Sequence, residues 1–192
     1  MPVGLNLCEG LETLSLFSNQ LENMSNDLSC LSCLTCLRLN LNRISVLCDS
    51  LFQCTLLSEL CLSDNRLSVV PKEVGKLTRL VHLQLGSNEL FALPRSVGLL
   101  TLLEELEVDH NALTHVPAEV GRLASLRELW LQNNCLVLLP PELGRLEHLK
   151  TLALTANMLS DIPVEFSSLH RLQELWLNGN FMEETPEAVA SM

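Results

Sequence analysis

At 192 residues the chain is long enough to bury a core, and 47% of its residues are hydrophobic although only 4% are aromatic. Its formal net charge of −11 argues against nucleic acid or an anionic membrane as the main partner. No secretory signal is recognisable at the N-terminus, and no apolar run is long enough to predict a membrane span. The eight cysteines are therefore expected to stay reduced, in the cytoplasm or the nucleus.

A unit of 23 residues repeats from residue 1 to residue 192, which predicts a single domain. Each unit contains the pattern L-x-x-L-x-L-x-x-N-x-L, with Val, Ile or Met in place of leucine at a few positions. Alternating leucines predict a short strand with one buried face, and stacked units predict a parallel sheet on the concave side of an arc. The repeat cores begin at Leu11, Leu34, Leu57, Leu80, Leu103, Leu126, Leu149 and Leu172.

The second half of each unit begins with a proline from the third unit onward. Such a segment predicts a short helical turn on the convex side, with the proline at its first position. An apolar residue follows each proline three residues later, so one side of each turn is expected to face the core. The prolines are Pro71, Pro94, Pro117, Pro140, Pro163 and Pro186.

This pattern resembles the leucine-rich repeat family, in particular its 23-residue intracellular, Ras-associated class, whose unit reads LPxxIGxLxxLxxLxLxxNxL. The chain is similar to suppressor-of-Ras scaffolds, to plant Ras-group proteins and to the repeats of Scribble and Erbin. The resemblance implies an α/β solenoid of eight units, with a parallel sheet on the concave face and helical or 3-10 turns on the convex face. It also implies a protein partner such as a small GTPase, a phosphatase or a kinase. Separately, we expect no cofactor.

One asparagine in each unit forms a column that we interpret as structural. Its amide can bond backbone groups that the turn after each strand would otherwise leave unpaired. This asparagine ladder consists of Asn19, Asn42, Asn65, Asn88, Asn111, Asn134, Asn157 and Asn180.

Three cysteines at three-residue intervals, Cys30, Cys33 and Cys36, could form half of a zinc site, a redox motif or no site at all. The repeat places Cys30 and Cys33 on the convex or connecting side, whereas Cys36 points outward from the concave strand. One metal ion could not reach all three thiols, so no metal site is predicted.

Other cysteines fall at different positions of the repeat. Cys8 and Cys54 occupy positions that are leucine elsewhere and are expected in the core. Cys61 lies one unit after Cys36, so a reactive pair of thiols at these two positions is an alternative.

Motifs for catalysis are missing from the sequence. It contains no Gly-rich phosphate loop, no GxSxG and no HExxH, and its five histidines occupy different positions of the repeat. We therefore expect no enzymatic activity.

Both tryptophans lie in one outward-pointing column of the predicted concave face. Trp130 and Trp176 are two units apart, which predicts a separation of about 10 Å with a slot above the small Ala153. Exposed tryptophans often anchor a partner, although rings lying flat as surface filler are the alternative.

Acidic residues dominate the same face, where Arg38 is the one basic residue in the three outward columns. A strip of this kind suits a partner that carries Lys or Arg beside apolar groups, although carboxylates can also serve solubility alone. The acidic residues are Glu59, Asp64, Glu105, Glu107, Asp109, Glu128 and Glu174.

These features favour a protein-interaction scaffold or adaptor in intracellular signalling. One alternative is the recognition arm of a larger kinase or ubiquitin ligase. Another is an assembly module that acts through its ends, because Leu5, Cys8, Val189 and Met192 fall within the repeat and no polar cap is recognisable.

Overall fold

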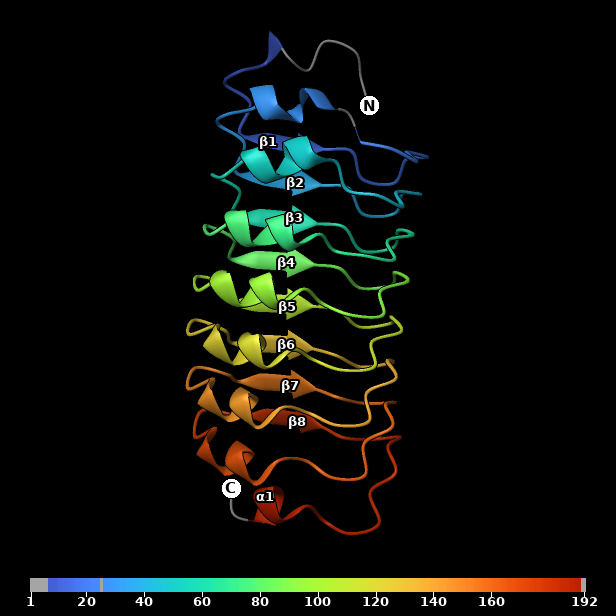
Figure 1. Ribbon diagram of the computed structural model, residues 1–192, viewed down its shortest axis with the longest axis vertical. Helices are drawn as coiled ribbons and strands as arrows, with labels where there is room; N and C mark the ends of the chain where they lie inside the picture. Colours follow the sequence, from blue (N-terminus) through green and yellow to red (C-terminus); the bar gives the residue numbers. More distant parts are fainter. Residues whose placement is uncertain (1–6, 25, 191–192) are drawn as a thin grey trace.

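The computed structural model describes residues 7–24 and 26–190. Eight three-residue strands form one parallel sheet whose strand order follows the sequence (Figure 1), so the predicted α/β solenoid is confirmed. The strands are β1 (Thr13–Ser15), β2 (Cys36–Arg38), β3 (Glu59–Cys61), β4 (His82–Gln84), β5 (Glu105–Glu107), β6 (Glu128–Trp130), β7 (Thr151–Ala153) and β8 (Glu174–Trp176).

The strand register is the same at every step of the sheet. Leu60 pairs with Leu83, and Leu83 pairs with Leu106, so the central leucines form one continuous row. In β4 this leucine is buried while His82 and Gln84 on either side are half-buried. We call the side that these flanking residues occupy the sheet face, which corresponds to the predicted concave face.

Short 3-10 turns cross over between successive strands on the opposite side of the leucine row. They are η2 (Asn26–Cys30), η3 (Asp49–Gln53), η4 (Lys72–Lys76), η5 (Arg95–Leu99), η6 (Ala118–Arg122), η7 (Pro141–Arg145) and η8 (Val164–Ser168), followed by α1 (Glu187–Ala190). The prediction that proline opens each turn is wrong by one residue. Pro71, for example, is extended (φ −64°, ψ 149°) and precedes η4, and its carbonyl accepts the first turn bond from Val74 at 3.1 Å.

The core is a stack of leucines between the sheet and the turns. Leu106, Leu129 and Leu152 are fully buried, and so are the valines of the turns, such as Val120. The turns pack closely because a glycine follows that apolar residue: a Cβ at Gly121 would overlap the carbonyl oxygen of the next turn. Since each leucine is covered by neighbouring units, the fold is stabilised by stacking.

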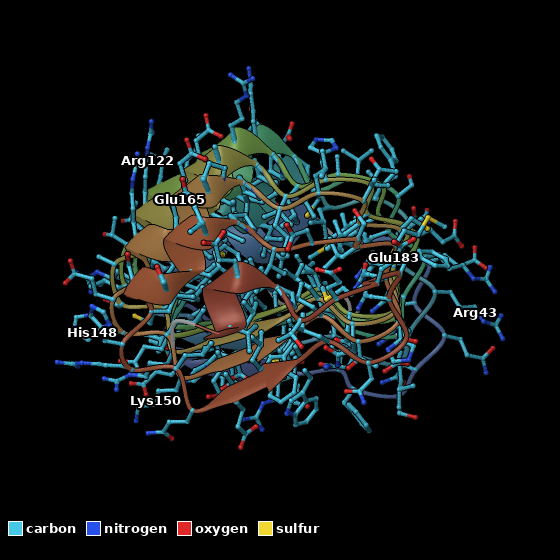
Figure 2. The ribbon with its side chains drawn as sticks, turned by 90° about the horizontal axis from the view of Figure 1, so that it is seen from below. Arg43, Arg122, His148, Lys150, Glu165 and Glu183 are labelled. Carbon is cyan, nitrogen blue, oxygen red and sulfur yellow. The ribbon has the colours of Figure 1, made fainter. Side chains whose placement is uncertain are left out.

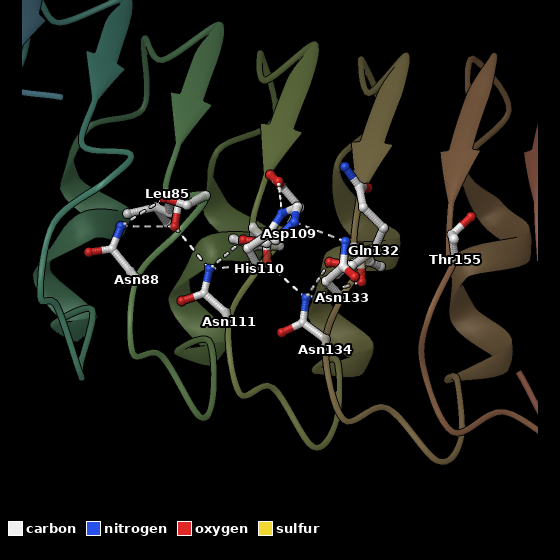
Figure 3. A network of polar contacts seen from close by, with 12 residues as sticks. Leu85, Asn88, Asp109, His110, Asn111, Gln132, Asn133, Asn134 and Thr155 are labelled. Atoms are coloured by element: carbon white, nitrogen blue, oxygen red, sulfur yellow. Dashed lines mark hydrogen bonds and ion pairs between the residues drawn. The ribbon is translucent and has the colours of Figure 1, made fainter. Parts of the chain in front are cut away.

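The asparagine ladder bonds to the backbone of two units at once. Asn65 donates from Nδ2 to the carbonyl oxygens of Leu39 and Leu62, both at 3.0 Å, and its Oδ1 accepts from the Ile44 amide at 2.9 Å. Figure 3 shows the Nδ2 groups of Asn88, Asn111 and Asn134 donating to backbone carbonyl oxygens. The side chain therefore supplies partners for backbone groups where the chain leaves each strand.

The residue before the ladder asparagine has a left-handed backbone in every described unit. Non-glycine residues rarely adopt this conformation, which costs roughly 1–2 kcal/mol. The adjacent asparagine bonds hold the turn in this shape. The residues are Ser18, Leu41, Asp64, Ser87, His110, Asn133 and Ala156, with Gly179 in the last unit.

The two ends of the stack differ in what the structure describes. At the C-terminal end α1 packs against η8 and buries Ala188, while Val189 is partly buried against the core. Leu5 and Met192, which the repeat pattern includes, lie outside the described residues. Within the described part of the chain, every helical segment is too short to traverse a lipid bilayer.

Candidate functional site

Trp130 and Trp176 touch each other on the sheet face. Their ring centroids are 5.5 Å apart and the ring planes are inclined by 77°, an edge-to-face pair. The predicted separation of about 10 Å with an open slot is therefore wrong. Ala153 lies fully buried on the strand between them, and its small side chain leaves room for the two rings to meet above it.

The tryptophan pair is held on one side by a carboxylate. The indole Nε1 of Trp130 donates to Glu128 Oε2 at 3.2 Å, which fixes the orientation of that ring. Trp176 remains 42% exposed, and Glu174 on the same strand is exposed as well. The pair therefore offers an accessible aromatic surface with two carboxylates beside it.

Further along the sheet, β5 carries two glutamates in one short strand. Glu107 has a pKa raised to about 7, because burial disfavours its charge and the neighbouring Glu105 adds a second negative group. Gln84 donates to Glu107 Oε1 at 3.2 Å, and His82 Nδ1 lies 2.8 Å from Glu105 Oε2. The carboxylates of β5 are thus partly paired with β4.

Asp109 belongs to a polar chain at the edge of the sheet face, shown in Figure 3. Its Oδ2 lies 2.7 Å from Nδ1 of His110, and Asn133 Nδ2 lies 3.1 Å from His110 Nε2. The neutral histidine with its hydrogen on Nδ1 satisfies both contacts, since Asn133 donates and Asp109 accepts. The hydrogen bond from His110 therefore holds the Asp109 carboxylate in place.

Glu59 is neutralised by Arg38 across β2 and β3. The guanidinium donates to both carboxylate oxygens, at 2.8 and 3.3 Å. This bond lowers the pKa of Glu59 to about 2. Asp64 lies exposed in the turn after β3 with φ 56°, away from the tryptophan pair. The candidate acidic residues therefore do not form one uniform strip, and Glu128 and Glu174 are the ones on the strands of the tryptophans.

Two of these side-chain contacts could have been predicted from the 23-residue period. His82 and Glu105 are partners across β4 and β5, and His110 precedes Asn133 by one full repeat. Reading each outward column for unlike neighbours would have found these contacts. Sequence reasoning missed them because it considered the histidines only as catalytic groups.

The cysteines differ from their expected places at two positions. Cys36 and Cys61, expected to point outward, are buried, and Cys61 donates to Glu59 Oε1 at 3.3 Å. Burial raises the pKa of Cys61 to about 12 and also raises that of Cys36. Both thiols therefore stay protonated, which disfavours a reactive pair.

The other cysteines of interest are either buried in the core or exposed. Cys54 is buried as predicted, and its pKa is raised to about 11 by burial, whereas Cys30 and Cys33 are exposed. Cys8 is exposed and not in the core, because no described repeat covers its side. Within the described residues no cysteine forms a disulfide, and no group of three side chains is arranged for a metal ion.

One row of leucines, one ladder of asparagines and a face of exposed side chains define a solenoid repeat protein. The family model of the leucine rich repeat matches residues 32–90 and 124–181, more than half of the chain. The chain therefore belongs to the leucine-rich repeat family, whose domains generally act as protein-interaction modules. No curated protein sequence matches the chain.

Solved structures share the fold over nearly all of the chain. The ectodomain of the plant membrane receptor kinase GASSHO1/SCHENGEN3 from Arabidopsis thaliana, in complex with CASPARIAN STRIP INTEGRITY FACTOR 2, is 32% identical with a TM-score of 0.91; the match covers 100% of this chain and 24% of that one. A leucine-rich repeat protein of Leptospira interrogans is 31% identical with a TM-score of 0.77, over 100% of this chain and 55% of that one. This chain thus spans about half or less of these relatives.

Proposed function

We propose that the chain is a non-catalytic module that binds a partner protein on its sheet face, with Trp130 and Trp176 as the anchor. The observation that carries this proposal is the edge-to-face pair itself. Two large rings stand together over Ala153, and one of them is still 42% exposed. Aromatic anchors in the centre of an interface typically contribute about 2 kcal/mol or more.

The surroundings of the pair favour a partner that presents Lys or Arg beside an apolar group. Glu128 and Glu174 stand at the other end of the same strands, where they can pair with a cation that lies over an indole face. Arg38 is already bound to Glu59, so the sheet face offers no free guanidinium to oppose such a ligand in the described strands. Charge complementarity would also speed association.

We further propose a cytoplasmic or nuclear setting and a role as a signalling scaffold or adaptor. The 23-residue unit supports the intracellular Ras-associated class, for which a small GTPase, a phosphatase or a kinase would be the partner. Similarity to plant ectodomains reflects the fold and does not decide the compartment.

The two tryptophans make this proposal directly testable. Because the chain has two tryptophans and no tyrosine, its intrinsic fluorescence reports on Trp130 and Trp176 alone. We expect a peptide of alternating Arg and Leu to change this emission saturably and to bind less tightly at high salt. An otherwise identical peptide of alternating Glu and Leu should leave the emission unchanged.

Matched variants separate the site from general charge attraction. With a labelled peptide, the Glu128→Gln, Glu174→Gln double variant and Trp176→Ala should each weaken binding by roughly tenfold or more. The Glu183→Gln, Glu184→Gln variant removes the same charge from exposed residues that follow β8 and lie outside the sheet, and it should bind normally. Equal loss in both double variants, or an unchanged emission, would contradict the proposal.

A recognition arm of a larger signalling enzyme is the second candidate. One observation favours it: a structure 32% identical to this chain is the ectodomain of a membrane receptor kinase. In that case the sheet face would bind in the same way, and the catalytic domain would be encoded next to this segment. Sequencing the complete transcript would distinguish the two candidates.

A further inference from the structure

A pocket of about 460 Å³ lies between the last two units, away from the tryptophan pair. It is lined by Gly144, Arg145, Glu147, Ser168, His170 and Arg171. Two arginines and a histidine thus gather at one place in a chain whose net charge is −11. Figure 2 shows His148 and Lys150, together with Arg122 from the preceding unit, on the side of the molecule opposite to Arg43.

One unit departs from the repeat at this pocket. Ser168 occupies the position that is Lys76, Leu99, Arg122 and Arg145 in the preceding units, so a short side chain stands where those units carry long ones. Next to it, His170 takes the place of Glu147 one unit earlier, and Arg171 takes the place of His148. These substitutions create space and add basic groups together.

The arginines of the pocket are available for a ligand. Arg145 and Arg171 are exposed, and neither forms an ion pair among the described residues, although the chain holds 23 acidic side chains. By contrast, Arg38 and Arg127 are each bound to a glutamate at 2.8 and 3.0 Å. Glu147 lines the same pocket, so its lining carries two guanidinium groups against one carboxylate.

The chemistry of the lining favours a phosphate group. Guanidinium groups bind phosphate oxygens through paired hydrogen bonds, and the Ser168 hydroxyl and His170 add further donors. A phosphate presents three acceptor oxygens, enough for two arginines and a hydroxyl, whereas a carboxylate presents two. We propose that this pocket, the Arg145–Arg171 pocket, binds the phosphoryl group of a phosphorylated serine or threonine in an exposed segment of a partner protein.

Charge around the pocket favours a peptide over a lipid surface. Glu142 and Glu165 line an adjoining pocket of about 280 Å³ that shares Arg145 and Ser168. An extended anionic membrane would approach these carboxylates and a chain of net charge −11, which repels it. One phosphorylated residue on a flexible segment brings far less negative charge against these carboxylates than an extended anionic surface does.

The test uses a short peptide of alanine and glycine that carries one phosphoserine. The expected result is a saturable shift of the arginine Nε–Hε signals of Arg145 and Arg171 in heteronuclear NMR, with no shift from the unphosphorylated peptide. The Arg145→Gln, Arg171→Gln double variant should weaken binding by roughly tenfold or more, because charge-assisted bonds are lost. Arg43→Gln, Arg66→Gln changes the net charge equally at exposed positions outside the pocket and should bind normally.

Ser168→Leu provides a second, uncharged variant. It restores the residue that Leu99 supplies in an earlier unit, so it should fold normally and block the pocket. Retained binding in Ser168→Leu, or equal loss in the Arg43, Arg66 control, would overturn the proposal. So would binding to phosphatidylserine vesicles or to inorganic phosphate in place of the phosphopeptide. Trp176→Ala should leave phosphopeptide binding unchanged, so failure here is distinguishable from failure of the proposed function.

Discussion

Trp130 and Trp176 meet edge to face across a strand that separates them in the sheet, with their centroids 5.5 Å apart. The two residues lie two strands apart, so their backbones are about 10 Å from each other. The rings close this distance by leaning over Ala153, which is fully buried. A single methyl group on the middle strand thus decides whether the two rings form one surface.

Replacing Ala153 with leucine should separate the rings. The larger side chain would occupy the space in which they meet, and the contact is expected to be lost. Near-ultraviolet circular dichroism, to which both tryptophans contribute, should lose the signal of the coupled rings. The free energy of unfolding should fall by about 1–3 kcal/mol, as for other overpacked sites.

Ala112→Leu is the matched control for this variant. It makes the same change at an exposed position outside the strands and turns, and it should leave the spectrum unchanged. An unchanged spectrum in Ala153→Leu would show that the rings are not held together by the small residue beneath them.

The asparagine ladder should be most important where it is most buried. Asn134 donates to the Val108 and Leu131 carbonyls at 2.9 and 3.0 Å, and its Oδ1 accepts from the Leu113 amide at 2.9 Å. We expect Asn134→Leu to lower the free energy of unfolding by roughly 1–3 kcal/mol, because buried backbone groups lose their partners. Urea unfolding followed by far-ultraviolet circular dichroism measures the change.

Asn19→Leu tests the same substitution in the first unit, where the asparagine is exposed. Water can replace the lost bonds there, so the cost should be well below that of Asn134→Leu. Equal costs at both positions would mean that burial does not set the contribution of the ladder.

Gly121 is required by the close approach of two 3-10 turns. A Cβ at this position would overlap the carbonyl oxygen of Glu142 in the next unit. We expect Gly121→Ala to separate η6 from η7 and to cost about 1–3 kcal/mol or more. At Gly10 an added Cβ meets no atom within 4 Å, so Gly10→Ala should leave the stability nearly unchanged. Thermal unfolding of both variants measures the difference.

Glu107 predicts a pH dependence of stability near neutrality. Its pKa of about 7 is above the usual value, so between about pH 4.5 and 7 the folded chain holds a proton that the unfolded chain has released. The free energy of unfolding should therefore fall as the pH rises through this window and level off above it. Across this window the free energy of unfolding should fall by about 1–2 kcal/mol, because Glu107 is only half-buried and solvent screens part of the effect.

Urea unfolding at about pH 5 and about pH 7.5 measures this effect. Glu107→Gln should reduce the difference between the two conditions, whereas Glu89→Gln, at an exposed position, should not. If Glu107→Gln kept the full difference, the pH dependence would have to arise from other groups.

The architecture could be predicted almost completely from the spacing of leucine and asparagine. Side chains that repeat every 23 residues must occupy equivalent places, so Leu83 and Leu106 were expected to pair, and they do. The position of the proline relative to each turn was wrong by one residue, because φ near −65° suits both the first turn residue and the extended residue before it.

The candidate site was less predictable, because register places Cα atoms and not side-chain ends. Trp130 and Trp176 were expected in one column, but whether long rings stand apart or meet depends on their side-chain rotamers. The same limit applies to Glu59, whose carboxylate reaches diagonally to Arg38. Cys36 and Cys61 are small enough to be covered by these longer neighbours, and a column of positions does not reveal that.

The strand that carries Trp176 is the last one of the sheet, and its leucines are less well covered than those inside. Leu175 and Leu177 are only partly buried, whereas Leu129 and Leu131 are fully buried. In a stack held by nearest neighbours, amide hydrogen exchange should therefore be fastest at the ends, where single units open locally. Each opening of the last unit would pull one ring from the other, so fraying at the C-terminal end would set how often the anchor is intact.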